Sequence, residues 1–300
     1  MLPRRFPFHT CDVFTDTRFG GNQLAVFPRA EGLSDVEMQQ IAREFNFAET
    51  SFVFPGGPGY TRRVRIFTPM MEVPFAGHPN VGTAAMLAMH GELGEVGDAL
   101  DVVFDEQAGP VAIRIVRRPG NRFRCDLTAP EPLRIGESVP VAAVAVAAGL
   151  AASDVLCTTH PPQLVSVGLA FLVAELRDVD ALRRLRPNFD GLVNLESIGT
   201  PFLHCYVRSG DAFDLRTRGL AAHDAGMEDP ATGSANAALA AMLAHYAPAS
   251  DGDFAWRIAQ GVEIGRPSVL EADVVKRGGV VMCVRIGGET VPVTTGTLEM

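Results

Sequence analysis

Lysine is almost absent from this chain of 300 residues, since Lys276 is its only example. A pyridoxal-phosphate enzyme needs a lysine for the Schiff base with its cofactor. Lys276 stands beside Arg277 in a predicted turn between two strand-like runs, which is a poor setting for that role. The scarcity of lysine therefore argues against pyridoxal-phosphate chemistry.

Cysteine and positive charge are also scarce. The five cysteines are scattered and form no C-x-x-C pair, a pattern typical of reduced thiols in a cytoplasmic protein. Acidic residues (35) outnumber lysines and arginines (26), and the formal net charge is −9. Because phosphate-rich partners require clustered cations, we expect no nucleic acid and no anionic membrane as a partner.

Long apolar runs and several common catalytic motifs are missing. The longest apolar run, residues 139–152, is shorter than the roughly 20 residues of a membrane-spanning helix, and no signal peptide is evident. The sequence contains no H-E-x-x-H, no G-x-S-x-G, no P-loop and no G-x-G-x-x-G. We therefore predict no metal site, no serine hydrolase and no nucleotide-binding loop.

The hydrophobic pattern predicts many strands and a few helices, an α+β composition. Ser34 and Glu37 form a capping box that opens a helix ending near Phe45. Two helices rich in alanine, methionine and leucine are expected at residues 83–90 and 235–246. Strands are expected, among other places, at residues 192–197, 280–286 and 291–295.

Two short segments indicate an internal duplication. Residues 78–84 (HPNVGTA) and 229–235 (DPATGSA) share proline, glycine and alanine at matching positions, and each leads into a predicted helix. They are about half the chain apart; chance similarity between short alanine-rich segments is the alternative. The duplication predicts two lobes, residues 1–128 joined by a final strand at about 287–300, and residues 129–286 after a proline-rich linker.

Each duplicated turn places proline and glycine at the entrance of a helix. Free N–H groups and the positive end of the helix dipole make such an entrance an anion site. If the two lobes face each other, both entrances converge on a cleft suited to a small carboxylate-bearing substrate. Taken alone, each turn is also explained as a capped helix, Asp229 as an N-cap and His78 as a buried histidine.

Glu49 is the strongest candidate for a proton-transferring residue. It lies in NFAETSF, between a predicted helix and a predicted strand, among apolar residues. A carboxylate in that setting is partly desolvated, which suits it to general acid–base catalysis. A solvated loop glutamate is the alternative.

These segments together resemble the PhzF-like family of phenazine biosynthesis, which has the diaminopimelate epimerase fold. The resemblance covers nearly the whole chain, and Glu228–Ala235 is its most specific part. The matching segments are Asp12–Thr15, Gly21–Val26, Glu49–Phe52, Gly77–Pro79, Glu228–Ala235, Gln260–Gly261 and Gly265–Ser268.

The resemblance implies two pseudo-symmetric lobes, each an antiparallel β-sheet or barrel wrapped around a central α-helix. It also implies a homodimer and an isomerase without metal or cofactor, in which the glutamate matched by Glu49 shuttles a proton. On that basis we predict catalytic roles for Glu49, His78 and Asp229. We predict that substrate is bound by Asn22, Gly77, Thr232, Gly233 and Ser234.

Racemases and epimerases of this fold use two cysteines, one at the start of each central helix. Here the corresponding positions are interpreted as His78 and Asp229, so racemisation by two thiols is disfavoured. Two alternatives stay open. One is an epimerase, racemase or lyase that uses Glu49 with His78 or Asp229, and the other is a metabolite-binding protein without turnover.

Overall fold

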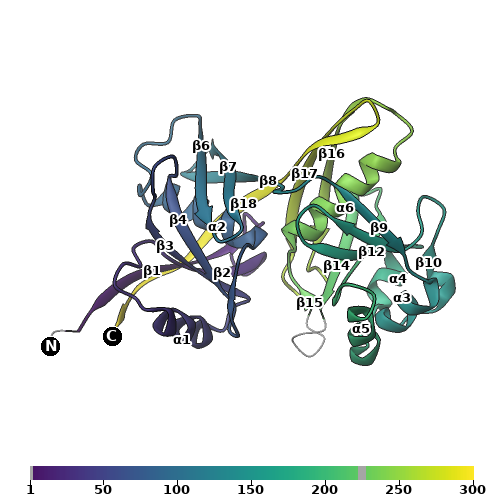
Figure 1. Cartoon of the computed structure of the whole chain (residues 1–300), viewed down its shortest axis with the longest axis horizontal. Coiled ribbons are helices and arrows are strands. Elements are labelled where there is room, and N and C mark those ends of the chain that lie inside the picture. The colour runs from purple at the N-terminus through teal and green to yellow at the C-terminus, as the bar shows by residue number, and fades with distance from the viewer. Residues whose placement is uncertain (1–2, 222–227) are drawn as a thin grey trace. The chain divides into compact units, whose positions relative to one another are not determined.

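The computed structural model describes residues 3–221 and 228–300 and divides the chain into two compact units (Figure 1). Unit 1 comprises Met1–Thr128 with Gly287–Met300, and unit 2 comprises Ala129–Ile286. The prediction that no signal peptide is evident concerns the N-terminal segment, and its first two residues, Met1 and Leu2, lie outside the described residues.

Unit 1 is a strand barrel. Its strands pair in the order β18–β1–β2–β3–β4–β6–β7–β8, and β8 returns to β18. The β2–β3 and β4–β6 pairs are parallel. Its elements are β1 (Arg5–Val13), β2 (Asn22–Phe27), α1 (Asp35–Phe45), β3 (Glu49–Pro55), β4 (Arg62–Phe67), β5 (Glu72–Val73), α2 (Gly77–Met89), β6 (Ala99–Glu106), β7 (Gly109–Arg118), β8 (Arg122–Thr128) and the part of β18 (Val280–Glu299) that begins at Gly287.

Unit 2 repeats this pattern. Its strands pair in the order β9–β11–β12–β13–β14–β16–β17, and the β12–β13 and β14–β16 pairs are parallel. Its elements are β9 (Arg134–Ser138), α3 (Val141–Ala148), the 3₁₀ turn η1 (Ala152–Asp154), β10 (Val155–Leu156), β11 (Gln163–Ser166), β12 (Ala170–Leu176), α4 (Val179–Arg184), α5 (Phe189–Glu196), β13 (Phe202–Arg208), β14 (Leu215–Ala221), β15 (Glu228–Asp229), α6 (Gly233–Tyr246), β16 (Gly252–Gln260) and β17 (Ser268–Arg277).

One buried helix forms the centre of each unit. Every residue of α2 from Gly77 to Ala88 is buried, and α6 is buried from Ala235 to Ala244. A helix that is apolar on all sides is stable only inside a core, and here the strands surround it. Gly82 illustrates the packing, since a Cβ there would lie 2.6 Å from side-chain atoms of Val13 and Leu24. This glycine therefore allows close contact between the helix and the strands.

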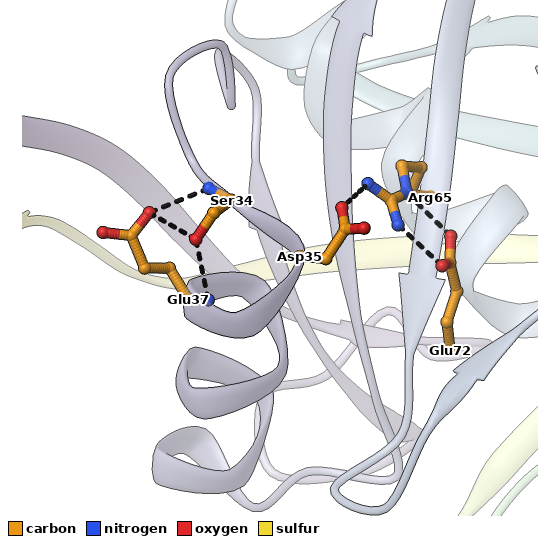
Figure 2. A network of polar contacts seen from close by, with 5 residues as sticks. All are labelled: Ser34, Asp35, Glu37, Arg65 and Glu72. Atoms are coloured by element: carbon orange, nitrogen blue, oxygen red, sulfur yellow. Dashed lines mark hydrogen bonds and ion pairs between the residues drawn. The ribbon is translucent and has the colours of Figure 1, made fainter.

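The capping box at the start of α1 is confirmed. Ser34 Oγ accepts a hydrogen bond from the Glu37 N–H (3.3 Å), and Glu37 Oε2 accepts one from the Ser34 N–H (2.8 Å), as Figure 2 shows. Asn46, in the left-handed conformation (φ 52°), ends the helix. These local signals fix both ends of α1.

One predicted strand and one predicted break between strands are wrong. Residues 192–197 belong mostly to helix α5, because Asn188 caps its first turn through the Gly191 N–H and a three-residue spacing buries Leu192 and Leu195 together. The predicted break between the last two strands is also absent. Strand β18 continues through Gly287, where a Cβ would lie 2.1 Å from the Asp126 carboxylate.

Lys276 caps the C-terminal end of α6 and does not lie in the open turn that was predicted. It is the penultimate residue of β17 and is 3% exposed, and its Nζ donates to the carbonyl groups of His245 (3.0 Å) and Ala247 (2.9 Å). These carbonyl groups belong to the C-terminal end of α6, where a cation is favourable.

We expect Lys276→Met to lower the free energy of unfolding by about 1–3 kcal/mol, because it leaves buried carbonyl groups without a donor. Arg277→Met is the matched control, since Arg277 is exposed and its loss costs about 0.5 kcal/mol or less. Urea denaturation of both variants measures the difference. Equal effects would contradict the capping role.

Candidate active site

Four of the predicted residues meet at one end of unit 1. Glu49 is the first residue of β3 and lies opposite Leu24 of β2, which itself begins at Asn22. Gly77 and His78 are the first two residues of α2. His78 Nε2 lies 3.4 Å from Glu49 Oε2, and His78 Nδ1 lies 3.3 Å from Asn22 Nδ2. The ends of β2 and β3 and the start of α2 thus gather Asn22, Glu49, Gly77 and His78.

The hydrogen bonds of His78 define its tautomer. The amide nitrogen of Asn22 can only donate, so Nδ1 of His78 accepts and the ring proton is assigned to Nε2. This N–H is directed at the Gln23 carbonyl oxygen (3.3 Å) and at the Glu49 carboxylate. Burial lowers the pKa of His78 to about 3, although the Gln23 carbonyl opposes the shift. A neutral His78 therefore presents its Nε2–H to the Gln23 carbonyl group, with Glu49 Oε2 next to the same nitrogen at 3.4 Å.

This depressed pKa predicts a defined sensitivity to acid. Between pH 6.5 and pH 3 the unfolded chain binds a proton at His78 that the folded protein does not, so stability falls as the pH is lowered through this range. We expect the stability advantage of wild type over His78→Gln to shrink by about 2 kcal/mol between pH 7 and pH 5. Urea denaturation at both pH values tests this. An advantage that is constant or larger at pH 5 would show that His78 is not buried in its neutral form.

The Glu49 side chain is only partly withdrawn from solvent, with 19% of its surface exposed. It lies beside the first turn of α2, whose leading N–H groups have no carbonyl partner within the helix. Glu49 Oε2 is buried against His78, while 19% of the side chain stays open to solvent. The arrangement can accept a proton from a bound substrate and can return it.

A second polar cluster surrounds the start of α6 in unit 2. Asp229 Oδ2 accepts a hydrogen bond from Thr232 Oγ1 (2.5 Å), and Gln260 Nε2 donates to the Asp229 carbonyl oxygen (2.8 Å). Gln260 Oε1 accepts from the Thr232 N–H (3.1 Å) and from Asn236 Nδ2 (2.7 Å). Gly233 and Ser234, both predicted binding residues, are the first two residues of α6. Asp229 and Thr232 are therefore fixed by a network that includes side chains from β16 and α6.

The structure corrects the register of the internal duplication. Sequence letters align Pro79 with Pro230, but the helices begin at Gly77 and Gly233. In this register Asn80 matches Asn236, and each donates its amide to the carbonyl group just before its helix, at 3.0 Å. His78 then corresponds to Ser234. Asp229 precedes α6 by four residues, so His78 and Asp229 are not equivalent positions.

When the two units are aligned by the starts of α2 and α6, an arginine–glutamate pair of unit 1 also matches one of unit 2. Arg65 of β4 binds Glu72 of β5 through Nε and Nη2 (2.7 and 2.6 Å), and it also binds Asp35 (Figure 2). Arg218 of β14 binds Glu228 of β15 in the same two-point manner, at 2.8 and 2.5 Å. Each pair stands just before a central helix. Both units therefore use one scaffold to fix the segment that enters the helix.

Sequence reasoning missed several supporting groups: the backbone carbonyl of Gln23 and the side chains of Asn80, Asn236 and, as a structural residue, Gln260. Asn80 and Asn236 each stand four residues after the helix cap, a spacing that could have identified them as helix-entrance residues. Gln260 was visible only as part of a matched segment, because its contacts depend on strand pairing.

Residues 3–221 and 228–300 contain no group of three or more histidine, cysteine, aspartate or glutamate side chains arranged to hold a metal ion. No helix in this part of the chain is long and apolar enough to cross a membrane.

Comparison with known proteins identifies the relatives of this chain. The model of a family described as phenazine biosynthesis-like protein matches residues 11–296. The chain belongs to that family. A relative named trans-2,3-dihydro-3-hydroxyanthranilate isomerase, from Pseudomonas fluorescens, is 32% identical over 96% of this chain and 98% of its own length. An uncharacterized isomerase of Mesorhizobium japonicum is 37% identical over 96% of each chain.

Solved structures agree on the fold. A Bacillus anthracis phenazine biosynthesis protein of the PhzF family superimposes with a TM-score of 0.89, covering 99% of this chain and all of that protein, at 24% identity. The predicted PhzF-like family, the α+β fold with a sheet around a central helix in each unit, and the isomerase class are thus confirmed.

Proposed function

We propose that this PhzF family member moves a proton on a small carboxylate substrate, with Glu49 as the residue that carries the proton. The observation that supports this most is the Glu49–His78–Asn22 chain of contacts, in which a neutral imidazole lies 3.4 Å from a carboxylate whose side chain is 19% exposed. A protonated histidine at this distance would lower the basicity of the Glu49 carboxylate. A neutral one leaves the carboxylate as the base.

The proposed reaction needs no net change in oxidation state. Glu49 removes a proton from an acidic C–H bond, the electron pair of that bond moves into the adjacent π-system, and the double bond shifts. The Glu49 carboxylic acid then returns the proton to another carbon. Substrate and product are isomers, so the proposal requires neither cofactor nor metal.

The remaining predicted residues bind and orient the substrate in this proposal. The first N–H groups of α2 and α6, which include those of Gly77 and Gly233, provide donors for a substrate carboxylate. Asn22 and Ser234 offer polar side chains, while Asp229 is held by Thr232 and Gln260. We propose that Asp229 acts in the same reaction, as a second acid–base group or as a hydrogen-bond acceptor for a polar substituent.

The relative from Pseudomonas fluorescens makes trans-2,3-dihydro-3-hydroxyanthranilate the first compound to test. The purified protein is incubated in D₂O with this compound and with a panel of small unsaturated carboxylates and amino acids, and products are followed by NMR. We expect a double-bond isomer to form without added cofactor or metal, also in the presence of a chelator.

Other outcomes identify the alternatives. Deuterium uptake with inversion at an α-carbon would indicate an epimerase or racemase, and loss of a leaving group would indicate a lyase. If a compound of the panel stabilises the protein against heat, but no compound undergoes exchange or conversion, the result would indicate a binding protein. Each of these results would overturn the proposed isomerisation.

A further inference from the structure

Glu106 is a buried acid with no role in the mechanism above. It is the last residue of β6 and is 7% exposed. Neither carboxylate oxygen makes a hydrogen bond of ordinary geometry with the described residues, although the Asn80 side chain lies close enough to lower the pKa somewhat. Burial is the larger effect and raises the pKa of Glu106 to about 8.

Strand register identifies the counterpart of Glu106 in unit 2. In β4 and β14, Phe67 and Leu220 hold the same position, because each pairs with the glutamate of the following short strand. Counting back five residues matches Arg62 with Leu215. The parallel partner of Arg62 is Phe104 in β6, and that of Leu215 is Ile258 in β16.

The last residues of the two strands therefore correspond: Glu106 of β6 matches Gln260 of β16. Gln260 supports the start of α6, because its carbonyl oxygen accepts from Asn236 (2.7 Å) and its amide nitrogen donates to the Asp229 carbonyl oxygen (2.8 Å). The position thus requires one acceptor and one donor. The counterparts in unit 1 are Asn80 and the Val73 carbonyl group.

A neutral carboxylic acid supplies both functions, since it has a carbonyl acceptor and an O–H donor, whereas a carboxylate has no donor. We propose that Glu106 is a positioning residue kept as a neutral acid, which supports the first turn of α2 through Asn80 and so holds His78 against Glu49. This role rests on the proposed function of Glu49. The acid acts through the helix entrance and does not touch the substrate.

Among the described residues, the charged or titratable groups near Glu106 come from β4, from β6 itself and from the first turn of α2. Strand β4 contributes Arg62, which donates to the carbonyl groups of Thr61 and Glu92, and the exposed Arg63. Asp105, the preceding residue, points to the opposite side of β6. The first turn of α2 contributes His78, whose pKa of about 3 places its titration far below the range in question, and beyond it lies Glu49.

Carboxyl ¹³C NMR tests the protonation state without any substrate. The Glu106 signal is assigned as the one missing from Glu106→Gln, and we expect it to titrate with a midpoint near pH 8. The ¹⁵N signals of the His78 ring are expected to shift with the same midpoint in wild type and to stay constant in Glu106→Gln. A Glu106 midpoint below pH 6, or His78 signals that do not respond, would overturn the inference.

Kinetics test the positioning role. We expect Glu106→Gln to keep kcat at pH 7 within roughly 3-fold of wild type and to lack the alkaline fall of wild type, roughly 10-fold between pH 7 and pH 9 for one group with this pKa. Glu106→Ala should lose roughly 10-fold or more in kcat at pH 7. An alkaline fall that is unchanged in Glu106→Gln would refute the role.

The NMR titrations and the kinetics together distinguish a failure of the proposed function from a failure of the proposed role of Glu106. If no isomerase activity exists, the NMR titrations still decide whether a neutral Glu106 supports His78. If activity is present and depends on Glu49, but Glu106→Gln and Glu106→Ala behave alike, the proposed function stands and the role of Glu106 is wrong.

Discussion

Glu49→Gln is expected to lower kcat by about 10³-fold while leaving the fold intact. Proton transfer by a positioned side chain typically contributes 10²–10⁴-fold, and a carboxamide of the same shape cannot accept the proton. His78, itself held by Asn22, remains beside the substituted side chain, so we expect substrate affinity to change little. Initial rates with the compound identified in the substrate panel give kcat and KM, and thermal denaturation verifies folding.

Glu44→Gln is the matched control for this prediction. Glu44 is an exposed carboxylate on α1, five residues away in the sequence, and the same carboxylate-to-amide change there should leave kcat unaltered. If Glu49→Gln retains more than a tenth of the wild-type rate, another group carries the proton. Asp229 would then be the next residue to substitute.

Arg218→Met should have the largest effect on stability, about 3–5 kcal/mol. The side chains of Arg218 and Glu228 are only 5% and 6% exposed, so removal of the cation leaves a carboxylate buried without its partner. The substitution also removes a donor to the carbonyl groups of Leu182 and Leu185. Urea denaturation gives the free energy of unfolding.

The duplicated pair in unit 1 provides an internal control. Arg65 and Glu72 have the same two-point geometry, but their side chains are 18% and 30% exposed, so Arg65→Met should cost only about 1 kcal/mol. The double variant Arg218→Met, Glu228→Gln should recover much of the loss, because no uncompensated charge remains. Equal losses for the two single arginine variants would contradict the dependence on burial.

Local signals in the sequence predict local structure well. Ser34 and Glu37 determine α1 because both capping interactions lie within one helical turn. Glu49, His78, Asp229 and Ser234 could be proposed from motif resemblance, and the structure gathers the first two directly. The roles of Asp229 and Ser234, which belong to unit 2, remain predictions.

Non-local features could not be predicted from sequence patterns. The sequence alignment of the two turns is wrong because identical residues in them occupy different structural positions. The structural match of Asn80 with Asn236 shows this. Helix α5 was mistaken for a strand since six residues do not distinguish the two periods. The correspondence of Glu106 and Gln260 depends on parallel strand pairing between segments roughly 40 residues apart, which no local pattern encodes.

A crystal structure of Glu49→Gln with the substrate bound tests the central claim most directly. The account predicts that the carboxamide of residue 49 lies about 3–3.5 Å from the carbon that loses its proton, with the His78 ring still beside it. A substrate bound with that carbon out of reach of residue 49 would contradict the assignment of Glu49 as the proton carrier.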